Sequence, residues 1–354
     1  MKKILLAIKL IVIPALLMFI AGCMEDDMRP VTAFNTSGNG IFIVCEGNFM
    51  YGNSSLAYYD LNSREITNQA FLQANGIPLG DVAQSLLMHN DLLWISINNS
   101  GKLYVIEPDS FLFRGKISGL SSPRYMLPLS ENEIWVSDLY SGHIHIIESS
   151  SFSKTGEISL NRDNNGKHNA EQMIRYGNQV ICNSWSYDNH LFFIDIASRE
   201  ITDSLEVRWQ PSKLCLDRNE KLWVLSDGGY EGSPFGKEAA ALQRINPENG
   251  EILSSFVFSE TDRPADICLN PGGDSIYLIN KDVYCFPVEA DHIGKPVIDG
   301  DQHNFYGIRA GEQELILSDA KNYMEPGNIF LYNRYFELTD SASTGINPAD
   351  FVFE

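Results

Sequence analysis

Short apolar runs recur along the chain at intervals of roughly 40 to 55 residues, a period typical of β-propeller blades. Segments 122–160 and 210–258 share one order of elements: an apolar strand, a polar turn, an aromatic-rich strand ending in Ser-Asp, a loop and two further strands. Four short strands per repeat predict an all-β, seven-bladed β-propeller. The second strand of the repeat is expected at IFIV (41–44), LLWIS (92–96), EIWVS (133–137), QVICN (179–183), KLWVL (221–225), SIYLI (275–279) and ELILS (314–318).

The C-terminal segment predicts how the ring closes. The first repeat begins directly at its second strand, and the final NPADFVFE resembles the first-strand segments SPRYMLPL, QPSKLCLD and RPADICLN. The last strand is therefore expected to complete blade one, which removes an exposed sheet edge. Residues 40–354 then form one domain. The Gly-His and Trp-Asp signature of WD40 repeats is missing, which indicates another kind of propeller.

The connecting loops differ between the two faces of the expected ring. With the strands of a blade lettered A to D from the centre outward, the A–B turns are short, polar and acidic. The B–C and D–A loops share the other face, and they gather aromatic residues there, which marks an interaction surface. The residues predicted to bind a ligand are Asn48, Phe49, Tyr51, Asn98, Asn99, Arg124, Tyr125, Asp138, Tyr140, Trp185, Tyr187, Trp209, Asp227, Tyr230, Arg263, Phe305, Tyr306 and Tyr323.

A structural role is the alternative for these side chains. Tyr125 and Tyr306, just inside strand A, would then pack between blades. The repeated Ser-Asp pairs place Asp138, Asp227 and Asp319 near the pseudo-symmetry axis, where carboxylates could hold a cation or polarise a substrate. The alternative is that each aspartate accepts backbone N–H bonds from its own loop, as turn aspartates commonly do.

Candidate catalytic groups are few. His143 and His145 share one strand face and could bind a metal ion, but no further histidine or cysteine lies at a suitable spacing to complete the site. His168 and His303 fall in D–A loops. The chain contains no nucleophile elbow, Gly-rich phosphate loop or H-E-x-x-H motif. A surface rich in Tyr, Trp, Asn and Gly has the composition of a binding site. We expect a binding protein with no catalytic residue, no metal and no cofactor.

The N-terminus predicts export. Residues 1–22 have a basic start and an apolar stretch typical of a signal peptide. IAGC resembles the lipobox of bacterial lipoproteins, which implies lipidation of Cys23, and the following MEDD resembles an acidic surface-export tag. An ordinary signal peptide and chance acidity are the alternatives. Residues 23–39 are expected to be a lipid-anchored flexible tether, which places the domain at the cell-surface side of the outer membrane.

The net charge limits the possible binding partners, and the placement of the cysteines indicates their role. The net charge of −20 becomes −23 without residues 1–22, which contain three lysines and no acidic residue. Such a surface repels polyphosphates, so no nucleic acid partner is expected, and the membrane is contacted through the lipid alone. The remaining cysteines, at 45, 182, 215, 268 and 285, lie in apolar runs and are interpreted as core residues, although a single disulfide stays an alternative.

Three segments carry a family resemblance: EGNFMYGNSSLAYYD, GIPLGDVAQSLLMHNDLLWISINNSGKLYVIE and SPRYMLPLSENEIWVSDLYSG. They resemble the YncE-like seven-bladed propeller lipoproteins, and among these the chain is most similar to the BtuG-type corrinoid capture proteins. The resemblance implies binding of a corrinoid (cobalamin, vitamin B12, or cobinamide) and its delivery to a TonB-dependent outer-membrane transporter. A glycan- or protein-binding scaffold, or a lyase or lactonase, are the alternatives.

Overall fold

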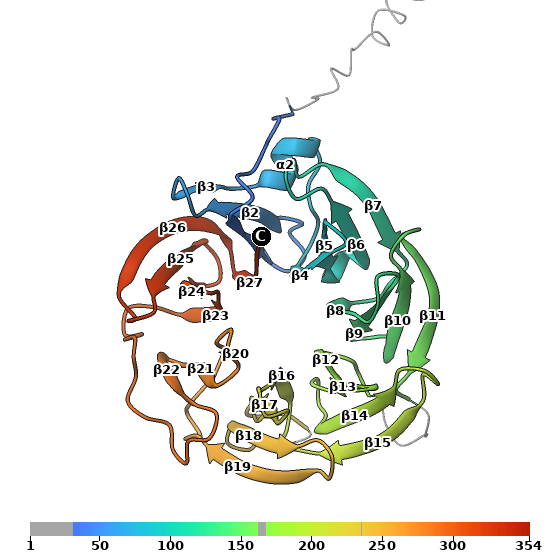
Figure 1. The fold of residues 1–354 in the computed structure, drawn as a ribbon, viewed down its shortest axis with the longest axis vertical. Coiled ribbons are helices and arrows are strands. Elements are labelled where there is room, and N and C mark those ends of the chain that lie inside the picture. Colours follow the sequence, from blue (N-terminus) through green and yellow to red (C-terminus); the bar gives the residue numbers. More distant parts are fainter. Residues whose placement is uncertain (1–30, 162–167, 235) are drawn as a thin grey trace, which may run out of the picture.

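A computed structural model describes residues 31–161, 168–234 and 236–354. Seven antiparallel sheets are arranged in a ring around a central axis (Figure 1). From the centre outward, blade one consists of β27 (Pro348–Phe353), β1 (Gly40–Cys45), β2 (Ser55–Asp60) and β3 (Glu65–Thr67). Blade two consists of β4 (Ala83–His89), β5 (Leu92–Ile97), β6 (Lys102–Ile106) and β7 (Phe113–Ser118). Blade three consists of β8 (Pro123–Pro128), β9 (Glu133–Asp138), β10 (His143–Glu148) and β11 (Ser153–Ser159).

The remaining blades follow the same order around the ring. Blades four to seven consist of β12 (Met173–Tyr176), β13 (Gln179–Asn183), β14 (His190–Asp195) and β15 (Ile201–Glu206); β16 (Pro211–Leu216), β17 (Leu222–Ser226), β18 (Ala241–Asn246) and β19 (Glu251–Val257); β20 (Asp266–Leu269), β21 (Ser275–Asn280) and β22 (Asp282–Pro287); β23 (Phe305–Ala310), β24 (Glu314–Asp319), β25 (Pro326–Asn333) and β26 (Leu338–Ile346). The all-β, seven-bladed prediction is confirmed, and each of the seven expected second strands is present.

The ring closes as the sequence predicts. The C-terminal β27 pairs antiparallel with β1, with Ile41 opposite Phe353 and Val44 opposite Asp350. Beside this seam, Ile41 and Phe351 of blade one pack in one buried cluster with Ile316 and Leu331 of blade seven. Closure therefore buries apolar surface of both end blades as well as pairing the edge of β1.

Blade six departs from the four-stranded expectation. It has three named strands, and the segment after β22 makes one isolated bridge, between Ile298 and Val283. This segment contains Gly294 and Pro296. Proline lacks the N–H that a ladder requires and glycine weakens a strand, which accounts for the missing fourth strand among the described residues.

The core lies between neighbouring blades. Trp94, Trp135 and Trp223 occupy one position of the second strand in three different blades, and each is essentially inaccessible to solvent. Cys45, Cys182 and Cys268 are also buried, and no disulfide forms among the described cysteines. Large aromatic side chains thus fill the wedge-shaped space where adjacent twisted sheets diverge.

Two short helices interrupt the strand pattern. The helix α2 (Ala70–Asn75) lies between blades one and two, and Phe71 stacks on Tyr104 with ring centroids 5.3 Å apart. A single 3-10 turn, η1 (Asn98–Ser100), forms the B–C loop of blade two. No helix in the described parts of the chain has the length and apolarity needed to cross a membrane.

The described end of the predicted tether lies against the domain. The amide of Thr32 donates to the carbonyl of Gln73, and the amide of Thr36 donates to that of Asp109. Phe34 packs edge-on against Phe111 with ring centroids 5.1 Å apart. The predicted signal peptide of residues 1–22 and the predicted lipidation site, Cys23, lie outside the described residues.

Candidate functional site

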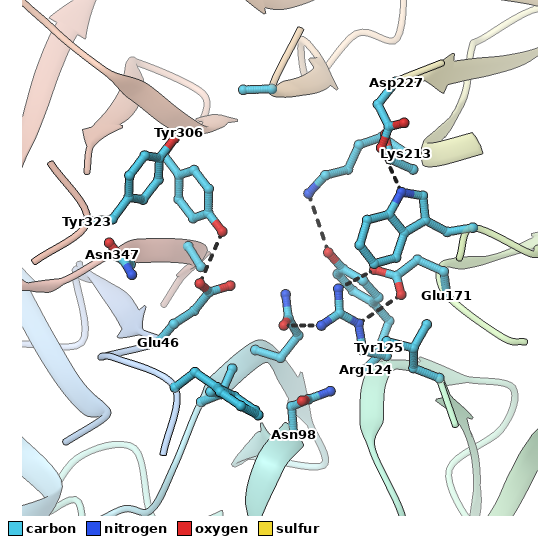
Figure 2. A pocket seen from close by; sticks show the side chains of 18 of the residues that line it. Glu46, Asn98, Arg124, Tyr125, Glu171, Lys213, Asp227, Tyr306, Tyr323 and Asn347 are labelled. Atoms are coloured by element: carbon cyan, nitrogen blue, oxygen red, sulfur yellow. Dashed lines mark hydrogen bonds and ion pairs between the residues drawn. The ribbon is translucent and has the colours of Figure 1, made fainter. Parts of the chain in front are cut away.

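A cavity of about 600 Å³ opens at the mouth of the channel, on the face that carries the B–C and D–A loops. More than half of the predicted binding residues line it, and they come from six of the seven blades. They are Asn48, Phe49, Asn98, Arg124, Tyr125, Tyr140, Trp185, Asp227, Tyr306 and Tyr323. Figure 2 shows these loops and inner strands turning their side chains toward one shared space.

The other predicted residues lie outside the cavity. Tyr51 and Asn99 are exposed on the rim loops, Arg263 is exposed and donates to two backbone carbonyls, and Trp209 is half-buried. Phe305 is a core residue that contacts the rings of His303 and Phe330.

Tyr187 and Tyr230 form a separate pair on the rim of blades four and five. Their hydroxyl oxygens lie 3.0 Å apart and their ring centroids 6.0 Å apart. Both residues remain more than 40% exposed. They add an aromatic step beside the cavity without lining it.

The wall at blades seven and one is built around a carboxylate. Glu46 follows β1 directly, and its Oε2 accepts a hydrogen bond of 3.0 Å from the hydroxyl of Tyr306 (Figure 2). The ring of Tyr323 stands edge-on to that of Tyr306, with centroids 5.9 Å apart. Burial raises the pKa of Glu46. A carboxyl in this setting is a strong hydrogen-bond acceptor held in a partly desolvated place.

The opposite wall contains a buried ion pair. Arg124 makes two charge-assisted bonds to Glu171, of 2.8 and 2.6 Å, and a third of 2.5 Å to Gln84. The side chains of Arg124 and Glu171 are 14% and 4% exposed. The guanidinium also lies 5.7 Å from the ring centroid of Trp185. This network links blades two, three and four, and it holds the guanidinium of Arg124 beside the ring of Trp185.

Trp185 connects this wall to a second carboxylate. Its indole N–H donates to Oδ2 of Asp227 over 2.7 Å, and the amide of Gly229 donates to Oδ1 over 2.8 Å. Burial raises the pKa of Asp227. Asp227 is thus the one aspartate of the three Ser-Asp pairs that faces the cavity.

The other two Ser-Asp aspartates support their own loops. Asp138 accepts bonds from the amides of Ser121, Ser122 and Ser141, and His145 approaches it to 3.2 Å. Burial alone would raise the pKa of Asp138, but these hydrogen bonds outweigh burial and lower it. Asp319 likewise accepts bonds from backbone amides and from His303. Both match the structural alternative.

The floor of the cavity is a lysine and a tyrosine. Lys213 lies 3.3 Å from the hydroxyl of Tyr125 and 3.3 Å from Oδ1 of Asp266. Burial alone would lower the pKa of Lys213, but the nearby carboxylate outweighs it and the pKa is raised. Below this pair the channel continues into a second cavity of about 410 Å³, which Lys213 and Tyr125 also line. The two side chains therefore divide the channel.

Sequence reasoning missed several polar and charged lining residues on the inner strands and in the segments beside them. Glu46, Gln84, Glu171, Lys213 and Asn347 all line the cavity or bond within it. One signal was available, because Lys213, like Arg124, follows a proline at the start of an apolar inner strand. A charge in such a run indicates a polar channel rather than a dry core.

One group of potential metal ligands lies away from the cavity. His168, Asp188 and His190 place three ligand atoms within 4.8 Å of one another, the one such group among the described residues. Both histidines bond to Asp188 through Nδ1 over 2.6 Å. The His143 and His145 pair is not part of such a group; its rings stack with centroids 6.4 Å apart.

Comparison with known proteins identifies the family. Residues 39–307 match the profile described as a domain of unknown function, DUF5074. The chain belongs to the DUF5074 family. None of the curated proteins matches it.

Solved structures similar to this DUF5074 chain are diverse propellers. A quinonprotein alcohol dehydrogenase-like protein from Bacteroides thetaiotaomicron has a TM-score of 0.68 and 13% identity, covering 90% of this chain and 79% of that one. The β-propeller domain of Cps50 (Swd1) from Myceliophteria thermophila has a TM-score of 0.64 and 10% identity, covering 88% and 99%. Kuenenia stuttgartiensis hydrazine synthase has a TM-score of 0.62 and 14% identity, covering 76% and 88%. At these identities the likeness concerns the fold alone.

Proposed function

We propose that this DUF5074 propeller is a cell-surface lipoprotein that captures a corrinoid and delivers it to a TonB-dependent outer-membrane transporter. The observation that carries the proposal is the single cavity mouth on which aromatic and amide side chains from six blades converge. The proposed action is binding, with no chemical step and no cofactor of its own.

The lining suits a flat macrocycle with an amide-bearing edge. Such a ligand needs apolar area for its faces and several polar partners around its rim. Phe49 and Tyr140 are 62% and 75% exposed beside the cavity, and Trp185 is half-buried in its wall. Asn48 and Asn98 add amide groups on neighbouring blades. A ligand too large to enter the cavity completely would still rest on these rim side chains.

Titration calorimetry tests the binding step. The chain from residue 24 onward, which retains every described residue, is titrated with cyanocobalamin and with cobinamide. Saturable binding is expected, and Phe49→Ala is expected to weaken it by roughly tenfold because an exposed stacking ring is lost. Tyr335→Ala removes an equally exposed aromatic from the C–D turn of blade seven, on the opposite face, and serves as the matched control. Absence of heat with both corrinoids would reject the proposal.

The rim supplies a surface for the delivery step. Met50, Tyr51 and Met324 are 77%, 72% and 65% exposed on the loops of blades one and seven. Asn48 joins the two loops by donating to the carbonyl of Tyr323 over 2.8 Å. We propose that this apolar sector contacts the transporter. Met50→Ser with Tyr51→Ser should then retain corrinoid binding but lose uptake by cells, whereas unchanged uptake would contradict the assignment.

The proposed anchor has its own test. Cys23→Ser should release the chain from membranes and abolish labelling with a radioactive fatty acid. Surface exposure is checked by protease digestion of intact cells, which should degrade the wild-type protein. A Cys23→Ser chain that stays lipid-modified would overturn the lipoprotein assignment.

A metal-dependent lyase or lactonase is the second candidate, and the cluster of His168, Asp188 and His190 is the observation that favours it. Three ligands with an open position are the arrangement of many catalytic zinc sites. Metal analysis of the purified chain distinguishes the candidates, since a stoichiometric ion lost in His190→Ala would support the enzyme.

A further inference from the structure

The cations at the channel mouth are committed to partners of this chain. Arg124 uses three N–H groups on Glu171 and Gln84, all within 2.8 Å. Lys213 is held between Asp266 and the hydroxyl of Tyr125 at the floor of the cavity. The strong donors of the lining therefore have acceptors already, and a ligand gains little from them.

Two carboxylates of the lining form no direct ion pair with a described residue, although Arg124 and Lys213 act on Glu46 and Arg263 acts on Asp227 from farther away. Within the part of the chain that the structure describes, no ion pair of 4.0 Å or less involves Glu46 or Asp227. Among the described residues, Glu46 accepts one hydrogen bond, from Tyr306, and Asp227 accepts two, from Trp185 and Gly229. An ionised carboxylate has about four acceptor sites, so both retain capacity for donors from a ligand.

Asn347 adds an independent sign of missing donors. It lines the same cavity and is 8% exposed. Its Nδ2 donates to the carbonyl of Gly47 over 3.0 Å, but its Oδ1 is buried and has no hydrogen-bond partner among the described residues. Buried acceptors without a donor are uncommon in native structures, and each one calls for an explanation.

We infer that the cavity selects its ligand through N–H donors, accepting primary carboxamide or ammonium groups at Glu46 and Asp227 and rejecting carboxylates there. The inference rests on the proposed function for its preferred ligand, an amidated corrinoid. Burial raises the pKa of both carboxyls and outweighs the opposing effect of Arg124 and Lys213 on Glu46 and of Arg263 on Asp227, so further negative charge is unfavourable there. A second carboxylate from a ligand would add like-charge repulsion in the same place.

The experiment compares ligands of similar shape that differ in their edge groups. The chain from residue 24 onward is titrated by calorimetry at pH 7 with dicyanocobinamide, with dicyanocobyrinic acid and with spermidine. Cobinamide carries carboxamides where cobyrinic acid carries carboxylates, and spermidine carries ammonium groups without a corrin ring. We expect cobinamide to bind roughly 10- to 100-fold more tightly than cobyrinic acid.

The variant Glu46→Gln with Asp227→Asn tests where the selection occurs. It keeps two acceptor oxygens and removes both charges, so the preference for cobinamide should fall to within roughly threefold. Asp91→Asn with Glu312→Gln is the matched control. It removes the same charge from two exposed A–B turns on the opposite face and should leave the preference unchanged.

The outcomes separate this inference from the proposed function. Equal binding of cobinamide and cobyrinic acid would overturn the inference and leave corrinoid capture intact. Binding of spermidine with neither corrinoid, lost in the double variant, would support donor selection and overturn corrinoid capture. A preference that survives in the double variant would overturn the assignment to Glu46 and Asp227. No binding of any of the three ligands would overturn both.

Discussion

The hydroxyl of Tyr306 donates to Oε2 of Glu46 over 3.0 Å across the seam at which blade seven meets blade one. The two residues are separated by 260 positions in the sequence, and ring closure brings them together. The bond thus joins a wall of the candidate site to the closure of the fold.

Tyr306→Phe should destabilise the domain. The change keeps the ring and removes the donor, so a partly buried carboxylate loses its partner, with an expected loss of about 1 to 3 kcal/mol in the free energy of unfolding. Urea unfolding followed by tryptophan fluorescence measures it. Tyr335→Phe, at an exposed turn, is the control and should change the midpoint little. Equal midpoints for both variants would show that the Tyr306 bond contributes nothing.

The ion pair of Arg124 and Glu171 should show strong coupling. Removing one partner leaves a buried charge, so Arg124→Met is expected to lower stability by about 3 to 5 kcal/mol. Glu171→Met should behave similarly. The double variant leaves no unpaired charge and should be less destabilised than the sum of the single variants. A double-mutant cycle in urea checks this, and additive losses would contradict it.

The repeating part of the fold could be predicted from the sequence because it is local. The continuous apolar residues of second strands such as IFIV (41–44) and ELILS (314–318) indicate that these strands are buried, and NPADFVFE resembles the other inner strands. Closure by β27 followed directly. Blade six was harder to predict, because its outer segment has the length expected for a fourth strand but does not form that strand's hydrogen-bond ladder.

The chemistry of the cavity depends on contacts that cross blades. The sequence shows that aromatic residues gather in the loops of one face. It does not show that Phe305 packs in the core while Tyr306, the next residue, faces the cavity. Alternation along a strand decides this, and a one-residue uncertainty in register reverses it. The pairing of Arg124 with Glu171, 47 residues away, left no local pattern in the sequence.

The pH dependence of stability should follow the direction in which folding shifts the pKa of each carboxyl. Burial raises the pKa of Glu46 in the folded chain, so the folded state holds that proton more tightly. The contribution to stability therefore falls as the pH rises from the unfolded pKa of about 4.3 through the folded value. Glu46→Gln should be more stable than wild type at pH 7, and the difference should shrink toward pH 4 in thermal melts.

Asp138→Asn should show the opposite dependence. Hydrogen bonds outweigh burial and lower the pKa of Asp138, so its contribution is present above the unfolded pKa of about 3.9 and is lost as the pH falls through the folded value. The variant should be less stable than wild type at pH 7, and the gap should narrow below about pH 3.9. Parallel pH profiles for the Glu46 and Asp138 variants would contradict the opposed environments.

Removing the closing strand should prevent a stable ring. A chain ending at Asn347 lacks β27, so the edge of β1 loses its partner and Phe351 leaves the cluster shared with blade seven. An unpaired apolar edge favours association between chains, so we expect a lower melting temperature and oligomers in size-exclusion chromatography. A synthetic peptide of residues 347–354 added in excess should restore the monomer, because it supplies the missing strand. A truncated chain that melts like the full-length protein would show that blade one is stable without β27.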